Sequence, residues 1–359
     1  QGCAIHHAIH AFAERHTFLF GVNHNDSFAQ IINTYPLNST EIFKDKDYAS
    51  EYSVDWCPGC GDYGIQRALK SALAILGLPP HRVAIFGGIG CSGKILYNLN
   101  VYGIHTLHGR LMSFASGAKL ANPELTVIAT GGDGDGVGIG AGHFVNSGRR
   151  NLDPTCILFN NSVYGLTKGQ PSPTLGLGEQ TKDMHQENLQ GSINPLILAA
   201  DSGYTWIVRG YAYDKYQLQD LMVQAIEHPG LSYIDVLQPC PKYNDLQTKD
   251  WYAGKDRDPP QSRLYPLQEE GYDPLISENA SEDQVKAGIT QCIEAALEWG
   301  ERIPTGVFLK NLARPQYLEL IAEHIPAHSP TPLARHPIAD EEGHSLANLG
   351  KILAKLKVG

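Results

Sequence analysis

Short apolar runs alternate with amphipathic stretches through the middle of the chain. Each run is β-branched or apolar and is bounded by turn-forming residues, so each predicts a buried strand. Stretches with helical periodicity lie between the runs, and this alternation predicts an α/β fold with a mostly parallel open sheet flanked by helices. The predicted strands are 83–86, 125–130, 155–159, 206–208, 231–237 and 306–309, and the predicted helices are 65–76, 137–148, 214–228 and 281–300.

Two of these runs end in motifs that combine glycine with oxygen-bearing side chains. Gly131-Gly132-Asp133-Gly134-Asp135-Gly136 follows the run 125–130, and Asn160-Asn161-Ser162-Val163-Tyr164-Gly165 follows 155–159. Open α/β sheets bind ligands at the carboxyl ends of their strands. Carboxylate and amide oxygens suit Mg²⁺, which often shares its coordination with phosphates, and glycine lets the backbone approach a phosphate. The pair predicts a diphosphate held through a metal; the alternative is two glycine-rich turns.

Four cysteines stand beside predicted strand or helix ends. Cys57 and Cys60 form a Cys-x-x-Cys pair before a helix, Cys91 lies in the glycine-rich loop after 83–86, and Cys240 follows 231–237. A thioredoxin-like redox pair would follow a strand, but residues 48–55 are polar. Four thiolates bind either Zn²⁺ or an iron–sulfur cluster, and both alternatives stay open at this point.

Two nucleotide-binding motifs are matched only in part. The loop 87–94 has P-loop spacing, but Ile95 replaces the Ser or Thr that would bind Mg²⁺. Gly136, Gly138 and Ala141 fit a dinucleotide pattern that lacks an acidic residue at a strand end. The loop 87–94 can still cradle a cofactor with its backbone N–H groups.

Composition limits the class of protein. The chain has 359 residues, 42% of them apolar, and a net charge of −10, which argues against a nucleic-acid surface. No run of about 18 apolar residues predicts a membrane span, and no signal sequence is visible, so a cytoplasmic enzyme is expected. Residues 1–52 form an unassigned extension, in which His6 and His10 favour an amphipathic segment over a metal site. The main domain is predicted at 53–312 and a tail at 313–359.

The motifs together resemble those of one enzyme family. They are WCPGCGDYGI at 56–65, GGIGCSGK at 87–94, LHGR at 107–110, GGDGDGVGIG at 131–140, NNSVYGLTKGQ and PSPT at 160–174, QPC at 238–240 and GVFLK at 306–310. Over residues 53–312 the chain is similar to the β subunit of 2-oxoacid:ferredoxin oxidoreductases, which binds thiamine diphosphate. The resemblance implies a thiamine-diphosphate-binding fold and coenzyme A-dependent oxidative decarboxylation of a 2-oxoacid. It also implies electron transfer through a [4Fe–4S] cluster to ferredoxin, and an α subunit in an αβ or (αβ)₂ assembly.

The same resemblance implies roles for individual residues. Cys57, Cys60, Cys91 and Cys240 would hold the cluster. Asp133 and Asn161 would bind Mg²⁺ by their side chains, and Val163 by its carbonyl group. The residues implied to contact thiamine diphosphate are Ile89, Gly90, Cys91, Ser92, His108, Gly134, Asp135, Gly165 and Leu166. Lys94 would face the 2-oxo acid end of the substrate.

Lys168 is the residue that indicates which 2-oxoacid is the substrate. Members acting on pyruvate tend to have T-G-G-Q where this chain has Thr167-Lys168-Gly169-Gln170. A lysine there can pair with a second carboxylate, which favours 2-oxoglutarate. A pyruvate or broad-range enzyme is the alternative, with Lys168 facing solvent or a partner. A non-enzymatic zinc-binding α/β protein would explain the four cysteines but would leave Asp133 and Asn161 without a role.

Overall fold

The computed structural model describes residues 42–325, 336–346, 350 and 354. The histidines His6 and His10 lie outside the described residues, as does most of a short basic helix that the sequence predicts at 344–357. Within the described part of that segment, residues 350 and 354 are helical, and Ser345 forms a bridge with Ala339.

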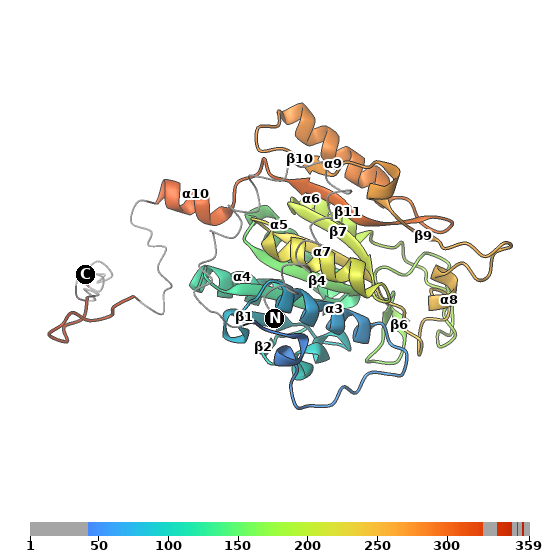
Figure 1. Ribbon diagram of the computed structural model, residues 1–359, viewed down its shortest axis with the longest axis horizontal. Coiled ribbons are helices and arrows are strands. Elements are labelled where there is room, and N and C mark those ends of the chain that lie inside the picture. The colour runs from blue at the N-terminus through green and yellow to red at the C-terminus, as the bar shows by residue number, and fades with distance from the viewer. Residues whose placement is uncertain (1–41, 326–335, 347–349, 351–353, 355–359) are drawn as a thin grey trace, which may run out of the picture.

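One large sheet organises the described chain (Figure 1). Its nine strands run in the order β10-β11-β7-β8-β4-β3-β1-β2, with β9 beside β11, and every pair is parallel except β7 with β11. The predicted mostly parallel open α/β sheet is therefore confirmed. The strands are β1 (Val83–Gly87), β2 (Tyr102–His105), β3 (Thr126–Gly132), β4 (Pro154–Asn160), β7 (Trp206–Tyr211), β8 (Ser232–Leu237), β9 (Leu264–Pro266), β10 (Leu275–Ile276) and β11 (Ile303–Asn311).

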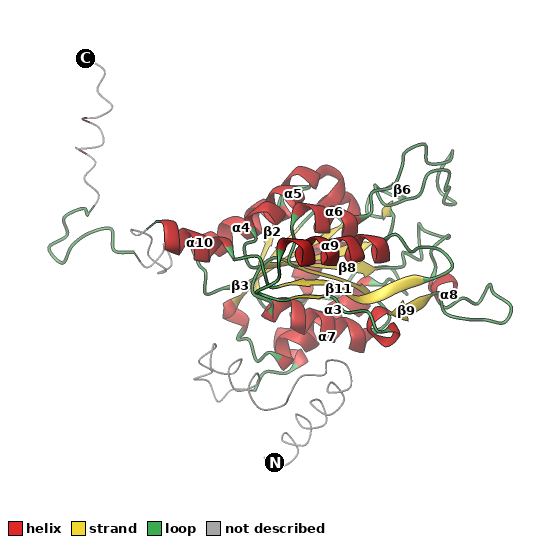
Figure 2. Cartoon of the chain, turned by 90° about the horizontal axis from the view of Figure 1, so that it is seen from above, coloured by secondary structure: helices red, strands yellow, loops and turns green. Residues whose placement is uncertain are grey.

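Helices cover both faces of the sheet, as Figure 2 shows. On one face α3 (Asp62–Ile75) packs against α7 (Lys215–Glu227) over one apolar core. The second core lies on the opposite face, under α4 (Leu111–Ala121), α5 (Ala141–Arg150), α6 (Pro195–Ser202) and α9 (Glu282–Ala296). The remaining short elements include η1 (Asp45–Tyr48), η2 (Pro80–Arg82), η3 (Ser92–Asn98), η4 (Gly134–Ile139), α8 (Lys249–Tyr252), η5 (Leu267–Glu270), α10 (Tyr317–His324) and a hairpin of β5 (Val163–Tyr164) with β6 (Gln170–Pro171).

Local chemistry explains where several helices begin. The Asp214 carboxylate accepts a hydrogen bond from the Gln217 N–H at 3.0 Å and caps α7. Ser281 and Gln284 form a capping box at the start of α9. The helix predicted at 137–148 is displaced, because the glycine-rich turn forms the π-helical segment η4 first and α5 starts at Ala141. A π-helical turn of this kind often marks a functional site.

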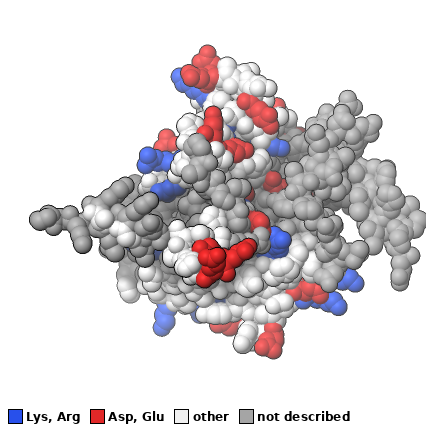
Figure 3. Space-filling model, turned by 90° about the vertical axis from the view of Figure 1, so that its left-hand side faces the viewer, with Lys and Arg blue, Asp and Glu red and all other residues white. Residues whose placement is uncertain are grey.

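The described surface carries charges of both signs. On the face drawn in Figure 3, acidic and basic side chains are dispersed around the rim, with an acidic group at the centre. Of the helices within the described ranges, none is long and apolar enough to cross a membrane.

Candidate active site

Four loops meet where four parallel strands end. Cross-strand register pairs Gly87 with Thr130, Gly132 with Phe159 and Asn160 with Leu237. The ends of β1, β3, β4 and β8 are therefore level to within three residues, or about 10 Å along the strands. The loops that follow carry Cys91, Asp133, Asn161 and Cys240, so the sheet delivers both predicted kinds of ligand to one edge.

Asp133 is a buried carboxylate held by two hydroxyl groups. Ser172 and Thr174 both donate hydrogen bonds to its Oδ2 atom. Burial raises the pKa of Asp133, and the hydroxyl bonds oppose that shift. No ion pair among the described side chains involves Asp133. A buried carboxylate without a cationic partner is costly, so this oxygen-rich site fits a divalent cation.

Asn161 lies beside Asp133 at the end of the neighbouring strand. Its Nδ2 donates to Gln238 Oε1 at 2.7 Å, and its Oδ1 accepts from the Val163 N–H at 3.1 Å. The Thr174 hydroxyl, already bonded to Asp133, also lies 2.9 Å from Asn160 Oδ1. The structure thus brings Asp133 together with the segment that contains Asn161 and Val163, the three predicted Mg²⁺ ligands.

Asp135 joins two loops of the proposed cofactor cradle. Its Oδ1 atom accepts hydrogen bonds from the Ile89 N–H at 3.0 Å, the Gly109 N–H at 2.9 Å and the His108 ring nitrogen Nδ1. Its other oxygen is buried and has no hydrogen-bond partner, and a Cβ atom on Gly88 would lie 1.9 Å from it. Asp135 therefore fastens the loop after β1 to the turn at 108–109. A direct contact of Asp135 with a cofactor stays a prediction.

Close packing explains why glycine recurs in the cradle. A Cβ atom on Gly134 would lie 2.2 Å from the Tyr164 ring, and one on Gly138 would lie 2.9 Å from Pro173. Two other predicted cofactor residues, Ile89 and Leu166, are 40% and 49% exposed. The cradle has a tightly packed floor and an open apolar rim.

The predicted thiol ligands also converge. A Cβ atom on Gly165 would lie 3.6 Å from Cys91 Sγ and 3.9 Å from Cys240 Sγ, so the sum of these distances, 7.5 Å, is the largest possible separation of the two sulfurs. Cys60 Sγ accepts a hydrogen bond from Gln238 Nε2 at 3.3 Å, and the Cys60 N–H bonds to the Cys57 carbonyl at 3.0 Å. All four thiols are free.

The buried surroundings of these cysteines disfavour the charged thiolate form when no metal is bound. Burial raises the pKa of Cys91 to about 11 and raises the pKa values of Cys60 and Cys240. A thiolate at these positions needs a positive charge nearby, which bound iron or zinc supplies. The four residues therefore fit a metal centre.

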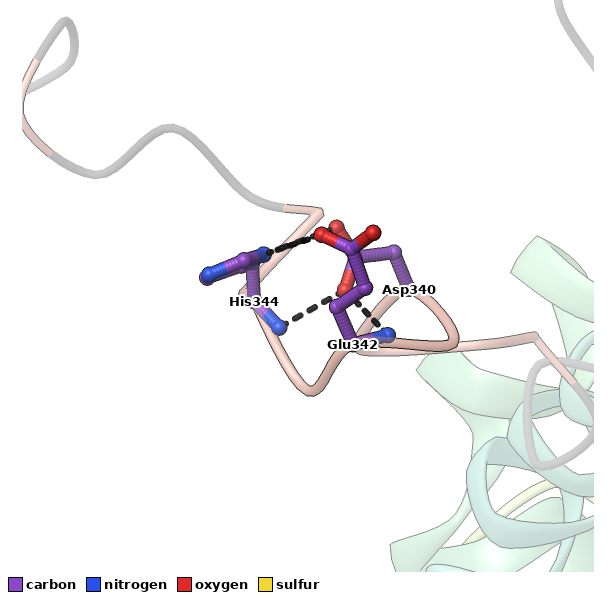
Figure 4. A group of neighbouring side chains, drawn as sticks. All are labelled: Asp340, Glu342 and His344. Carbon is purple, nitrogen blue, oxygen red and sulfur yellow. Dashed lines mark hydrogen bonds and ion pairs between the residues drawn. The ribbon is translucent and has the colours of Figure 1, made fainter.

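The spacing of the sulfurs is wider than one zinc ion requires. Tetrahedral zinc with Zn–S bonds of about 2.3 Å brings its ligand sulfurs to about 3.8 Å from one another. Among the described residues, one group of three possible metal ligands has ligand atoms that all lie within 4.8 Å of one another. It consists of Asp340, Glu342 and His344 on an exposed turn (Figure 4). No three of the four cysteine sulfurs meet that limit.

Sequence reasoning missed Asp62, which follows the Cys-x-x-Cys pair directly. Its carboxylate is 1% exposed and neither oxygen has a hydrogen-bond partner. Burial raises the pKa of Asp62 to about 7, although the Cys60 thiol and the Lys94 amine oppose the shift. The acidic residue in the sequence Cys-Gly-Asp was the available signal.

The two lysines predicted to be catalytic lie in different places. Lys94, on η3, pairs with Asp55 at 2.9 Å, and the bond to Asp55 raises the pKa of Lys94. Lys168 is exposed in the loop of the β5–β6 hairpin and lines a cavity of about 880 Å³. Tyr164 and Ser172 also line this cavity, which thus adjoins Asp133, whereas Lys94 does not line it. The roles of both lysines stay predictions.

Fold and site define a thiamine-diphosphate-binding protein of the α/β class. Residues 88–236 match the family model of the thiamine pyrophosphate enzyme C-terminal TPP binding domain. Residues 240–324 match the model of the C-terminal region of the pyruvate ferredoxin oxidoreductase beta subunit.

Individual relatives narrow the class. The 2-oxoacid:ferredoxin oxidoreductase subunit beta of Saccharolobus solfataricus is 47% identical over 307 residues, which are 85% of this chain and 97% of the relative. The chain therefore belongs to the β subunits of 2-oxoacid:ferredoxin oxidoreductases, enzymes that work with an α subunit. This membership overturns the alternative of a non-enzymatic zinc protein.

Two further relatives carry narrower names. The 2-oxoglutarate oxidoreductase subunit KorB of Mycobacterium tuberculosis is 41% identical over 202 residues, 56% of this chain and 54% of the relative. A solved 2-oxoglutarate:ferredoxin oxidoreductase from Magnetococcus marinus, with 2-oxoglutarate, coenzyme A and succinyl-CoA bound, superposes with a TM-score of 0.72. It is 32% identical in sequence, and the match covers 89% of this chain and 98% of that one.

Proposed function

We propose that this chain, as a β subunit, serves the coenzyme A-dependent oxidative decarboxylation of 2-oxoglutarate and passes electrons through one [4Fe–4S] cluster to ferredoxin. The observation that carries the proposal is the position of Gly165. It belongs to the segment that follows Asn161, and the Cys91 and Cys240 sulfurs both lie within 4 Å of a Cβ atom placed on it. The predicted cofactor and cluster sites are therefore adjacent, as electron transfer between them requires.

Each part of the strand-end site has a distinct task. Asp133, Asn161 and the Val163 carbonyl would hold Mg²⁺, and Cys57, Cys60, Cys91 and Cys240 would hold the cluster. The loops that Asp135 fastens together would bind the diphosphate with backbone N–H groups. Thiamine diphosphate, when bound, supplies an electron sink for decarboxylation.

The substrate assignment depends on Lys168. Lys168 lines the cavity next to Asp133, and its ammonium group can pair with the second carboxylate of 2-oxoglutarate. The names of the KorB relatives and the 2-oxoglutarate bound in the related structure support this choice. Pyruvate has no second carboxylate for this lysine to bind.

Steady-state kinetics test the substrate. In the complex with the α subunit, Lys168→Ala is expected to raise the KM for 2-oxoglutarate about tenfold or more and to change the KM for pyruvate less than about twofold. Lys182→Ala removes an exposed lysine that does not line the cavity, and it should leave both constants unchanged. Equal effects of Lys168→Ala on both substrates would remove the argument and favour a broad-range enzyme.

Purification under anaerobic conditions tests the cofactors. The proposal expects a brown protein with absorbance near about 400 nm, bound iron and an EPR signal after reduction. Colourless, iron-free protein that does not respond to added thiamine diphosphate would refute the proposed cofactor set.

The surroundings of the site indicate where the α subunit binds. Ile89 and Leu166 on the rim of the cradle, and Leu107 beside His108, are between 40% and 70% exposed. We infer that this rim is covered by the α subunit, which completes the site. The proposed domain remains 53–312, although the second family model extends to residue 324. The described cysteines are free thiols, which suits a cytoplasmic location.

A further inference from the structure

Asn160, the first residue of the Asn-Asn pair, belongs to a buried chain of hydrogen bonds that ends at Asp133. Its Nδ2 donates to Asp235 Oδ1 at 3.0 Å, and its Oδ1 lies 2.9 Å from the Thr174 hydroxyl. The single hydroxyl proton of Thr174 is shared between Asn160 Oδ1 and Asp133 Oδ2 in a three-centre hydrogen bond. The opposite end of the chain is an ion pair in which Arg209 Nε donates to Asp235 Oδ2 at 2.8 Å.

The ion pair gives this chain a rigid anchor. Arg209 on β7 and Asp235 on β8 are direct partners in the sheet register and are 2% and 0% exposed. The guanidinium group also lies 5.5 Å from the Trp299 ring centroid and 5.7 Å from that of Phe308. Because Asp235 accepts the Asn160 amide hydrogen, the amide orientation is fixed and its oxygen must face Thr174.

The hydroxyl groups control how the Asp133 carboxylate is turned. Thr174 and Ser172 both bond the same atom, Oδ2, so they restrict rotation of the carboxylate and leave Oδ1 to coordinate a cation. The β5–β6 hairpin places these residues, because it returns the chain and lets the Ser172 N–H bond to the Ser162 carbonyl at 3.2 Å. Ser172 also lines the cavity, so one short segment joins the cavity wall to Asp133.

We propose that Thr174, aligned through Asn160 by the buried Arg209–Asp235 ion pair, is a positioning residue that sets the orientation of the cation-binding carboxylate of Asp133. The inference rests on the proposed role of Asp133 as a Mg²⁺ ligand. It assigns Asn160 a role distinct from that of Asn161: one asparagine aligns the site and the other binds the ion.

Mg²⁺ binding provides the test. The complex with the α subunit is stripped of Mg²⁺ and thiamine diphosphate, and the Mg²⁺ dissociation constant is measured by titration with the cofactor present, using protein fluorescence. Thr174→Val removes the hydroxyl and keeps the shape, so the constant should rise about 10- to 100-fold. Thr174→Ser keeps a hydroxyl and should bind within about threefold of wild type.

A matched control comes from the same loop. Thr181 is fully buried and its hydroxyl has no hydrogen-bond partner, so Thr181→Val should leave the dissociation constant unchanged. Adding Asn160→Ala to Thr174→Val should weaken binding by less than about twofold more, because Asn160 acts through Thr174. Thr174→Ala replaces the valine variant if the latter does not fold.

The outcomes separate this inference from the proposed function. Three outcomes would each overturn the positioning role of Thr174. Thr174→Val could bind Mg²⁺ as tightly as wild type, Thr174→Val and Thr174→Ser could lose Mg²⁺ affinity equally, or Thr181→Val could lose as much Mg²⁺ affinity as Thr174→Val. Asp133→Ala is measured in parallel. If it loses Mg²⁺ binding while Thr174→Val does not, the proposed cation site stands and only the positioning role fails; if it binds normally, the cation site itself is wrong.

Discussion

Substitutions at Gly165 test whether the cofactor loop lies directly against the thiol site. An added Cβ atom would make ordinary van der Waals contacts of 3.6 Å with Cys91 Sγ and 3.9 Å with Cys240 Sγ. The backbone of Gly165 does not have a positive φ angle, so alanine fits without strain. Valine adds two methyl groups, each about 1.5 Å beyond Cβ, in two of the three staggered positions. Two of the three valine rotamers therefore direct a methyl group toward the sulfurs.

The expected loss of iron affinity in Gly165→Val can be worked out from the free-energy cost of overpacking. Extra methyl groups in a filled site cost about 1–3 kcal/mol, which corresponds to about 5- to 150-fold weaker binding of whatever the thiolates hold. We therefore expect Gly165→Ala to retain iron and Gly165→Val to lose most of it. The assay is iron per polypeptide after anaerobic purification, together with the absorbance near about 400 nm. These readouts do not depend on turnover.

Gly142 supplies the control for this substitution. A Cβ atom at Gly142 would meet nothing within 4 Å, so Gly142→Val changes glycine to the same side chain in open space and should keep its iron. Full iron content in Gly165→Val would refute the reasoning, because it would mean that the cluster does not occupy the space next to Cys91 and Cys240.

Three further predictions concern stability and use urea unfolding. Gly64→Ala would place a methyl group 1.7 Å from the Ala212 carbonyl oxygen, so a loss of about 3 kcal/mol or more is expected, and a loss below about 1 kcal/mol would contradict the packing. Burial lowers the pKa of His228 to about 3, so its stabilising contribution is complete above the unfolded pKa of about 6.5 and declines as pH falls toward 3. Wild type should lose about 1.4 kcal/mol between pH 8 and 5.5 that His228→Phe does not lose, and parallel pH profiles would contradict this. Asp235→Ala leaves the Arg209 guanidinium buried without its partner and should cost about 3–5 kcal/mol, much of it recovered when Arg209→Met is added.

The sequence predicts the inner strands of the sheet better than its edges. Strands such as β4 and β8 are buried along their whole length and appear as mostly apolar runs. The edge strand β2 has four exposed residues, so no apolar pattern marks it. The segment 245–277, which is rich in proline, aspartate and glutamine, contains α8, β9, η5 and β10, which are too short for periodicity to reveal. The apolar run 195–200 predicts neither a helix nor a strand, because a run this short has no polar face to indicate the helix α6.

At the site, the sequence indicates which residues are present but not which of them touch. The glycine motifs and the four cysteines are local signals, and the structure brings them to one edge. The bonds from Ser172 and Thr174 to Asp133 span about 40 residues of chain, and the bond from Asn160 to Asp235 joins two strands whose pairing no local pattern specifies. Asp135 was predicted to contact the cofactor, whereas its observed partners are the backbone of two loops and His108.

Strand order gives the reason why the thiols and the cation site belong together. Cys91 follows β1 and Cys240 follows β8, and β3 and β4 lie between those strands. Three strand spacings of about 4.8 Å separate the two strand ends by about 14 Å. Since the sulfurs are no more than 7.5 Å apart, the two loops must lean toward each other across the ends of β3 and β4, which lead into Asp133 and Asn161. The thiols therefore cannot converge without covering the strand ends that carry the proposed Mg²⁺ ligands, and in this topology the proposed cluster would help to close the cation site.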